Sequence, residues 1–424
     1  CDVVLPEISA MFRRFALLAL MLLATPAGAA EPRSRPHIVL IMADDLGYAD
    51  CGFNGGTQIA TPHLDRLAAA GTVLESFYVQ PVCSPTRAAL MTGRYPMRYG
   101  LQVGVIRPHA DYGLPLEEQT LAAGLRDAGY TTAICGKWHL GSFAAEYHPL
   151  ARGFTHAYGH LFGAIDYFTH RRDGQLDWYR DGRPVQEEGY STHLLGAEAV
   201  RLIERHDAST PLFLYVPFNA VHTPQQVPDR YLEPYRALPQ KRRSLAGMLA
   251  ALDEQVGRIV AAVDGRGWRD DTLFLFSSDN GGPDPGRTTD NGRLRAGKGT
   301  VYEGGVRVCA FATWPGQLPA GARNPRPLHI VDWYPTLLRL ATARVEQKLP
   351  LDGLDAWDAL RGTAESPHDA ILMNAAPQGG AIRMGEWKLV VSRGRRGAPR
   401  RRDADGADAL ELYDLAKDPG ETRD

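Results

Sequence analysis

Four short apolar runs, each ending in charged or polar residues, constrain this chain more than any other feature. They read HIVLIMADD (37–45), YTTAICGKWH (130–139), PLFLYVPFNAVH (211–222) and DTLFLFSSDN (271–280). Helix-like stretches lie between them, including TPHLDRLAAAG (61–71) and SLAGMLAALDEQVGRIVAAV (244–263). Strand-like runs that alternate with helices are typical of an α/β fold. The chain is therefore predicted to form a large, mostly parallel sheet flanked by helices.

The pattern changes in the last part of the chain. From about Glu365 onward we expect three strands without long helices between them, AILMNA, AIRMGEWKLVVS and LELYDL. This predicts a small antiparallel domain over residues 365–424, after a large domain over residues 31–364. The chain stops at DPGETRD without an obvious closing element, which suggests that the small domain is truncated.

The first thirty residues have the layout of upstream sequence followed by a secretory signal peptide. Arg13 and Arg14 precede the apolar run FALLALMLLA, and the small residues AGAA follow it. A membrane anchor needs roughly 18 apolar residues, and this run is shorter. We expect residues 1–30 to direct export to the periplasm or the exterior, with no stable membrane span.

Charge composition excludes some classes of partner. The chain has 47 Lys and Arg residues against 49 Asp and Glu residues, for a net charge of -2. No global positive field favours nucleic acid or an anionic membrane. Any charged ligand must therefore be bound by a local cluster, and no nucleic-acid partner is expected.

Acidic residues follow the first and fourth apolar runs. Ligands of open α/β sheets bind beyond the carboxyl ends of the strands, so Asp44, Asp45, Asp279 and Asn280 are expected at one edge. Their oxygen atoms suit Ca²⁺ or Mg²⁺ better than zinc, and calcium tolerates a carboxylate-rich shell better than magnesium. An isolated Asp-Asp pair is more often a turn or a helix cap. Two such clusters favour a metal site.

Basic side chains follow the same runs or precede helices. Arg87, Lys137 and Lys298, with His139 and His222, could surround a tetrahedral oxyanion with charge-assisted donors. Each has a simpler interpretation by itself. His139 could be a packed core histidine, and Lys298 could be a solvated lysine in a glycine-rich loop.

Cys83 precedes what looks like the entry to a helix, in the sequence CSPTR. A helix N-terminus favours an anion, so this residue could be a thiolate nucleophile or an inert structural thiol. Cys51, Cys135 and Cys309 are interpreted as small buried apolar residues, with one disulfide among them left open. Neither interpretation of Cys83 explains Pro85 and Arg87.

A family resemblance explains this motif. CSPTR followed by AALMTGRYP resembles the signature of the type I sulfatases, in which a formylglycine-generating enzyme oxidises the cysteine to Cα-formylglycine. Further similar blocks follow in family order: GKWHLG, AVHTPQQVP, SDNGG, AGKGTVYEGGVRV and LYDLAKDPGE. The segment ARGFTHAYGHLFGAIDYFTH is similar to the arylsulfatase B branch, which includes N-acetylgalactosamine 4-sulfatase. The resemblance implies an alkaline phosphatase-like fold, with residues 31–364 as the catalytic domain.

The resemblance also implies roles for individual residues. The implied Ca²⁺ ligands are Asp44, Asp45, Asp279, Asn280 and an oxygen of converted Cys83. Arg87 and His139 would hold and polarise the formylglycine hydrate, Lys137 and Lys298 would bind the sulfate, and His222 would lie near the leaving oxygen. One hydroxyl of the hydrate would attack sulfur, and the other would be deprotonated to expel sulfate. Cys309 stands where the family commonly has proline, which should affect a loop more than the chemistry.

The predicted function is that of an exported sulfuric ester hydrolase acting on a sulfated sugar or an aryl sulfate. One alternative is a phosphate or phosphonate ester hydrolase of the same superfamily. Another is a sulfated-glycan-binding protein in which Cys83 stays unconverted. The arginine-rich segment RGRRGAPRRRDADG would suit a polyanion, although charge runs of this kind are usually solvated insertions.

Overall fold

The structure is a computed structural model, and it describes residues 35–343, 348–376, 379–392 and 409–424. The predicted signal peptide and the arginine-rich segment at 393–406 lie outside the described residues. Among the residues that are described, no helix has the length and apolarity needed to cross a membrane.

A ten-stranded sheet forms the centre of the fold, and its middle strands are the four predicted runs. They are β11 (Thr272–Ser278), β1 (His37–Ala43), β10 (Leu212–Pro217) and β4 (Thr131–Lys137), which pair in that order and in parallel. β5 (His156–His160) continues the parallel set. The flanking strands are β13 (Ala310–Thr313), β2 (Thr72–Leu74) and β14 (Ala322–Asn324) on one side, and β8 (Tyr179–Arg180) and β9 (Arg183–Pro184) on the other. Since β13 and β8 run antiparallel to their neighbours, the sheet is mixed around a parallel centre.

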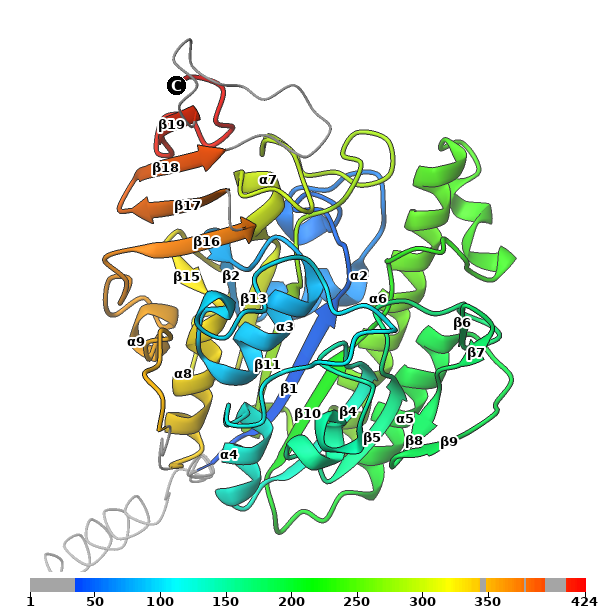
Figure 1. Cartoon of the computed structure of the whole chain (residues 1–424). Helices are drawn as coiled ribbons and strands as arrows, with labels where there is room; N and C mark the ends of the chain where they lie inside the picture. Colours follow the sequence, from blue (N-terminus) through cyan, green and yellow to red (C-terminus); the bar gives the residue numbers. More distant parts are fainter. Residues whose placement is uncertain (1–34, 344–347, 377–378, 393–408) are drawn as a thin grey trace, which may run out of the picture. The chain divides into compact units, whose positions relative to one another are not determined.

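Helices cover both faces of the sheet, as the continuous apolar runs require (Figure 1). One layer contains α3 (Cys83–Thr92), α4 (Leu121–Asp127) and α8 (Trp333–Leu340). The other contains α2 (Pro62–Ala69), α5 (Ser191–Arg205) and α6 (Gln240–Gly265). Alternate residues of β1 divide between the two cores, because Ile38 and Leu40 face the first layer while Val39 and Ile41 face the second. The predicted α/β class is confirmed.

Shorter elements connect these layers. They comprise α7 (Glu303–Val306) and α9 (Trp357–Leu360), a small sheet of β12 (Arg307–Val308), β3 (Phe77–Tyr78) and β15 (Leu328–His329), and a two-stranded ribbon of β6 (Arg171–Arg172) and β7 (Gln175–Leu176). Short 3₁₀ helices span Gly52–Asn54, Pro96–Arg98, Ala145–Tyr147, Pro149–Arg152, Asp229–Tyr231, Glu233–Tyr235, Arg269–Asp271 and Ile330–Asp332.

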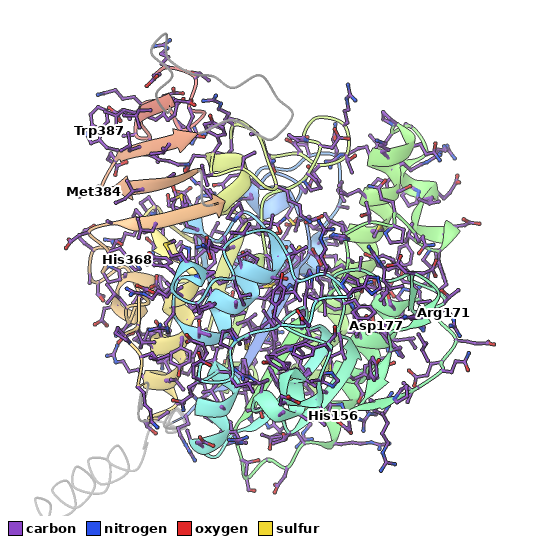
Figure 2. The ribbon with its side chains drawn as sticks, viewed as in Figure 1. His156, Arg171, Asp177, His368, Met384 and Trp387 are labelled. Atoms are coloured by element: carbon purple, nitrogen blue, oxygen red, sulfur yellow. The ribbon has the colours of Figure 1, made fainter. Side chains whose placement is uncertain are left out.

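The C-terminal region forms the expected antiparallel sheet, but with four strands instead of three. They are β16 (Ile371–Ala376), β17 (Gly379–Met384), β18 (Trp387–Ser392) and β19 (Ala409–Asp414). The second predicted run is a hairpin, because Gly385 adopts a positive φ of 55° and lets Met384 pair with Trp387 across a tight turn. Figure 2 shows these two side chains at the outer end of the sheet, where both are exposed.

Helix α3 also differs from the prediction at its first turn. The sequence suggested that Ser84 and Pro85 lead into the helix, whereas the helix begins at Cys83. Val82 is extended, and proline is accepted in a first turn because its missing N–H has no partner there. The side chain of Cys83 therefore starts from the first residue of a helix whose every residue is buried. Cys51, Cys83, Cys135 and Cys309 are all buried free thiols.

Candidate active site

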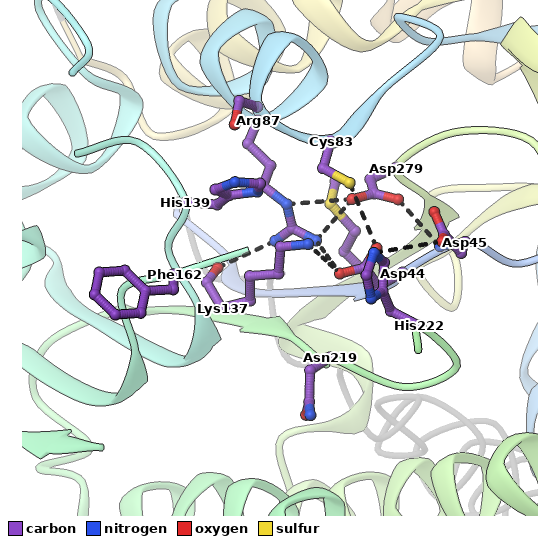
Figure 3. A network of polar contacts seen from close by, with 12 residues as sticks. Asp44, Asp45, Cys83, Arg87, Lys137, His139, Phe162, Asn219, His222 and Asp279 are labelled. Atoms are coloured by element: carbon purple, nitrogen blue, oxygen red, sulfur yellow. Dashed lines mark hydrogen bonds and ion pairs between the residues drawn. The ribbon is translucent and has the colours of Figure 1, made fainter. Parts of the chain in front are cut away.

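The residues predicted from the four runs meet at the carboxyl edge of the parallel strands (Figure 3). Asp44 and Asp45 follow β1, Lys137 ends β4, His222 follows β10, and Asp279 follows β11. Parallel pairing of adjacent strands places all these ends at one edge. Helix α3 contributes Cys83 and Arg87 to the same place, and the loop before α7 contributes Lys298.

Cys83 lies at the centre of this group. Its Sγ is 3.7 Å from Asp44 Oδ1 and 3.5 Å from Lys298 Nζ. Burial raises the pKa of the thiol to about 12, since the nearby lysines only partly offset burial and the carboxylates of Asp279 and Asp44. The encoded thiol is therefore protonated at neutral pH, which argues against the thiolate interpretation.

Arg87 is a buried cation with specific partners. Its Nη2 and Nε atoms donate to Asp279 Oδ2 at 2.8 and 3.2 Å, and its Nη1 donates to the carbonyl oxygen of Lys137 at 3.1 Å. Burial alone would lower the pKa of Arg87, but Asp279 and other nearby groups outweigh it and the pKa is raised. The guanidinium thus joins α3 to the ends of β4 and β11.

The two lysines pair with the two adjacent carboxylates. Lys137 Nζ donates to Asp44 Oδ2, and both side chains are fully buried. Lys298 Nζ lies 2.6 Å from Asp45 Oδ1. Burial would raise the pKa of each carboxyl, but both values are lowered, mainly by Lys137 for Asp44 and by Lys298 for Asp45. Both aspartates are therefore ionised.

The acidic side chains present oxygen atoms that fit a hard divalent cation. Ligand atoms of Asp44, Asp45, Cys83 and His222 all lie within 4.8 Å of one another. Asn280 Nδ2 donates to Asp45 Oδ1 at 2.8 Å, while Asn280 Oδ1 is buried without a hydrogen-bond partner. A buried acceptor without a donor is costly unless a ligand completes it. Asp279 Oδ1 accepts the Asp45 N–H at 3.2 Å, so it lies beside this group.

The tautomer of His139 follows from its hydrogen bond. Its Nε2 lies 2.9 Å from the carbonyl oxygen of Ile106, which can only accept, so Nε2 carries the proton. Nδ1 is left as a buried lone pair without a partner. The pKa of His139 is well below its usual value because of burial and the nearby Lys137 and Arg87. The imidazole is therefore neutral and can accept a proton at Nδ1.

His222 lies at the exposed side of the group. Its Nε2 is 3.6 Å from Asp45 Oδ2, and its side chain is 18% exposed. Tyr167 holds the turn that carries it, because the Tyr167 hydroxyl lies 2.8 Å from the His222 carbonyl oxygen. His222 is thus placed where a ligand entering from solvent would meet it.

The sequence interpretation missed two supporting residues. The Ile106 carbonyl sets the tautomer of His139, and no side-chain pattern could indicate a backbone acceptor. Asn291 joins two motif blocks, because its side chain accepts from Gly282 N and donates to the carbonyl oxygens of Gly282 and Ala296. Its place shortly before AGKG was a signal available in the sequence.

Comparison with known proteins agrees with this fold. The family model described as Sulfatase matches residues 36–343. The chain belongs to the sulfatase family.

Two curated relatives and one solved structure illustrate the similarity. Arylsulfatase J of Mus musculus is 38% identical over 371 residues, which cover 85% of this chain and 62% of that protein. Arylsulfatase A of Homo sapiens is 36% identical over 440 residues, covering 95% and 85%. The structure of Ps i-CgsB in complex with k-i-k-neocarrahexaose superposes with a TM-score of 0.83 at 35% identity, covering 92% and 88%. The chain thus spans less than two thirds of the first relative.

Proposed function

We propose that this protein hydrolyses a sulfate ester to an alcohol and sulfate, after conversion of Cys83 to formylglycine and with Ca²⁺ in the site. The observation that carries the proposal is the arrangement around Cys83. Lys298 and the carboxylate of Asp44 contact its sulfur, and the open Nδ1 of His139 and the unpartnered Oδ1 of Asn280 belong to the same site.

The proposal assigns residues of this arrangement to the metal ion and to the converted side chain. Asp44, Asp45, Asp279 and Asn280 would hold Ca²⁺, which supplies a positive charge that polarises the oxygens bound to it. As formylglycine, residue 83 would supply a hydrated aldehyde with one hydroxyl for attack on sulfur and one for release of sulfate.

The chain's own residues perform the remaining tasks. Lys137 and Lys298 would bind the sulfate oxygens. The sulfate would then replace the carboxylates of Asp44 and Asp45 as the partner of the two lysines. Arg87 keeps residue 83 oriented through its hold on Asp279 and on β4. His139 Nδ1 is the acceptor for a proton from residue 83, because its Nε2 is committed to Ile106. His222 would donate a hydrogen bond from Nε2 to the leaving oxygen in its doubly protonated form, because its Nδ1 lies 2.6 Å from the Thr223 carbonyl oxygen.

The substrate class proposed here is a sulfated sugar or an aryl sulfate. The solved complex of Ps i-CgsB with k-i-k-neocarrahexaose supports the inclusion of oligosaccharides in the substrate screen. We also propose export to the periplasm or exterior, on the basis of the N-terminal sequence, and maturation by a formylglycine-generating enzyme.

Mass spectrometry of the peptide that contains residue 83 provides the direct test. The protein would be produced with a formylglycine-generating enzyme, and sulfate release from aryl sulfates and sulfated sugars would be measured with Ca²⁺. An aldehyde at residue 83 together with sulfate release is the expected result. Hydrolysis of phosphate or phosphonate esters alone would favour the alternative hydrolase. Binding of sulfated glycan by unconverted protein, without release, would favour the binding protein.

A further inference from the structure

The segment that carries Lys298 is held by the C-terminal sheet on both sides. Arg295, three residues before Lys298, donates from Nη1 to Glu411 at 3.0 Å, to the Tyr413 hydroxyl at 2.6 Å and to the Glu421 carbonyl oxygen at 3.1 Å. Its guanidinium also stacks on Tyr302, 3.9 Å from the ring centroid. The first side of the segment is thus attached to β19 and to the residues after it.

The second side of the segment ends in a buried cluster of charges that we call the anchor cluster: Glu303, Lys388, Glu421 and Arg307. Lys388 Nζ, on β18, lies 2.9 Å from Glu303 Oε1 and 2.8 Å from Glu421 Oε1. Glu421 Oε2 accepts the Glu303 backbone N–H at 2.7 Å. The side chains of Lys388, Glu303 and Glu421 are all fully buried.

The remaining oxygen of Glu303 is also satisfied. The Tyr78 hydroxyl donates to Glu303 Oε2 at 2.8 Å, and Arg307 Nη1 lies 3.4 Å from the same oxygen. Burial would raise the pKa of Glu303, but Lys388 and Arg307 outweigh it and the value is lowered. The pKa of Glu421 is raised, because burial and the Glu303 carboxylate outweigh Lys388. Both carboxylates therefore depend on Lys388, since an unpaired charge in a buried region would be strongly unfavourable.

The anchored segment contacts the active site through its backbone. Glu303 begins α7, and the Gly305 carbonyl oxygen accepts the N–H of Gly281, the residue after Asn280, at 3.0 Å. The approach is close, because a Cβ at Gly281 would lie 1.8 Å from the Gly304 carbonyl oxygen. A shift of α7 would therefore move the turn that carries Asp279 and Asn280.

The position of Lys298 also depends on Arg295 and on the anchor cluster. Its segment also contacts the loops at the edge of the main sheet: Gly299 N donates to the Pro81 carbonyl oxygen at 2.8 Å, Asn291 Nδ2 donates to that of Ala296 at 2.9 Å, and Lys298 N lies 3.4 Å from that of Gly282. A lysine side chain has several rotatable bonds, so its position opposite Asp45 and Cys83 relies on a fixed backbone.

From these contacts we infer that Lys388, Glu303 and Glu421 are positioning residues for Lys298 and for the Asp279–Asn280 turn. The C-terminal sheet then acts as the support that fixes one wall of the active site. The motif LYDLAKDPGE gains a role, since its glutamate is Glu421. The effect on catalysis rests on the proposed function, whereas the anchoring itself does not.

Hydrogen–deuterium exchange of the full chain tests the anchoring independently of activity. Lys388→Met removes the shared cation, and Lys417→Met is the matched control, because Lys417 is an exposed lysine paired with Asp414 beside the same sheet. We expect faster exchange over residues 295–306 in Lys388→Met, with β1 and β11 unchanged, and no change in Lys417→Met. Unchanged exchange over residues 295–306 in folded Lys388→Met would overturn the proposal.

A second variant covers the case in which Lys388→Met does not fold. Glu421→Gln keeps an oxygen that can accept the Glu303 N–H but removes one charge. It should accelerate exchange in the same segment to a smaller extent, and unchanged exchange there would again overturn the proposal.

Kinetics of matured protein on an aryl sulfate then separate positioning from general stability. Lys298→Ala should lower kcat/KM by about 100-fold or more, as expected for loss of one charge-stabilising donor. Lys388→Met should lower it by roughly 10-fold, and the double variant should lose clearly less than the product of the two single losses, because part of the effect of Lys388 acts through Lys298. Multiplying losses would overturn positioning through Lys298. Absence of sulfate release by matured protein without substitutions would reject the proposed function, and the exchange experiment would still decide the anchoring.

Discussion

The active-site group and the anchor cluster are both built from buried charges, but only the anchor cluster is closed. Each carboxylate oxygen of Glu303 and Glu421 has a cation, N–H or O–H group within 2.9 Å, and Lys388 contacts Glu421 Oε1 as an ion pair without hydrogen-bond geometry. In the active site, by contrast, Asn280 Oδ1 and His139 Nδ1 are buried without partners. An unsatisfied buried acceptor lowers stability unless a ligand or a proton completes it, and these two atoms lie among the proposed metal and nucleophile residues. The anchor cluster fixes the positions of neighbouring residues, whereas the unpartnered active-site atoms can bind a ligand or accept a proton.

The largest expected effect comes from residue 83. Cys83→Ala should abolish sulfate release, because alanine cannot be converted to the aldehyde, while the fold persists. Cys135→Ala is the matched control. This buried thiol belongs to the core on the side of α2, α5 and α6, so the variant should retain activity. Sulfate release would be followed by ion chromatography. Wild-type turnover by Cys83→Ala would reject the formylglycine nucleophile.

The next effect concerns the proposed Ca²⁺ ligands. Asp45→Asn keeps the shape of the side chain but removes a negative charge, and it should weaken Ca²⁺ binding by about 10- to 100-fold. Isothermal titration with Ca²⁺, on protein freed of metal by a chelator, measures this without reference to activity. Asp127→Asn, an exposed aspartate at the end of α4 that pairs with Arg126, serves as the control outside the active site. Equal Ca²⁺ affinity in Asp45→Asn and wild type would contradict the metal assignment.

Removal of the unpartnered Nδ1 of His139 should slow turnover. His139→Ala is expected to reduce kcat by about 100-fold or more, the range for a lost general base. The lowered pKa also predicts the pH dependence: the neutral imidazole persists as pH falls below 6.5, and the base is lost only as pH falls through its lower folded value. A kcat profile from about pH 5 to 8 tests this. An acidic limb centred at the ordinary histidine pKa would assign the limb to a different group or remove His139 from this role.

The smallest expected effect on chemistry, and a large one on stability, concerns the closed cluster. Lys388→Met leaves two buried carboxylates facing one cation, which should cost about 3–5 kcal/mol of unfolding free energy. Adding Glu421→Gln restores one carboxylate against one cation, so the double variant should regain much of that loss. Chemical denaturation measures the three unfolding free energies, with Lys417→Met as a surface control. A double variant less stable than Lys388→Met would contradict the charge-balance explanation.

Local sequence patterns were sufficient for much of the fold. The four apolar runs were strands because an apolar, β-branched run buried on both faces fits the centre of a parallel sheet. The split of AIRMGEWKLVVS into two strands was missed, because a single glycine in a strand-like run gives a weak turn signal. The α3 start was also missed, since a proline is compatible with several positions in a first helical turn.

The sequence by itself determined which chemical groups are available, because residues that end parallel strands share one edge whatever their spacing along the chain. Asp44, Lys137, His222 and Asp279 were found in this way, and CSPTR added Cys83 and Arg87. Only the tertiary structure decided which ring nitrogen of His139 is free, that Lys298 contacts Cys83, and that Lys388 joins Glu303 to Glu421. These contacts join residues up to 215 positions apart, as Cys83 and Lys298 show. Strand order, register and loop path set such distances, and no local pattern encodes them.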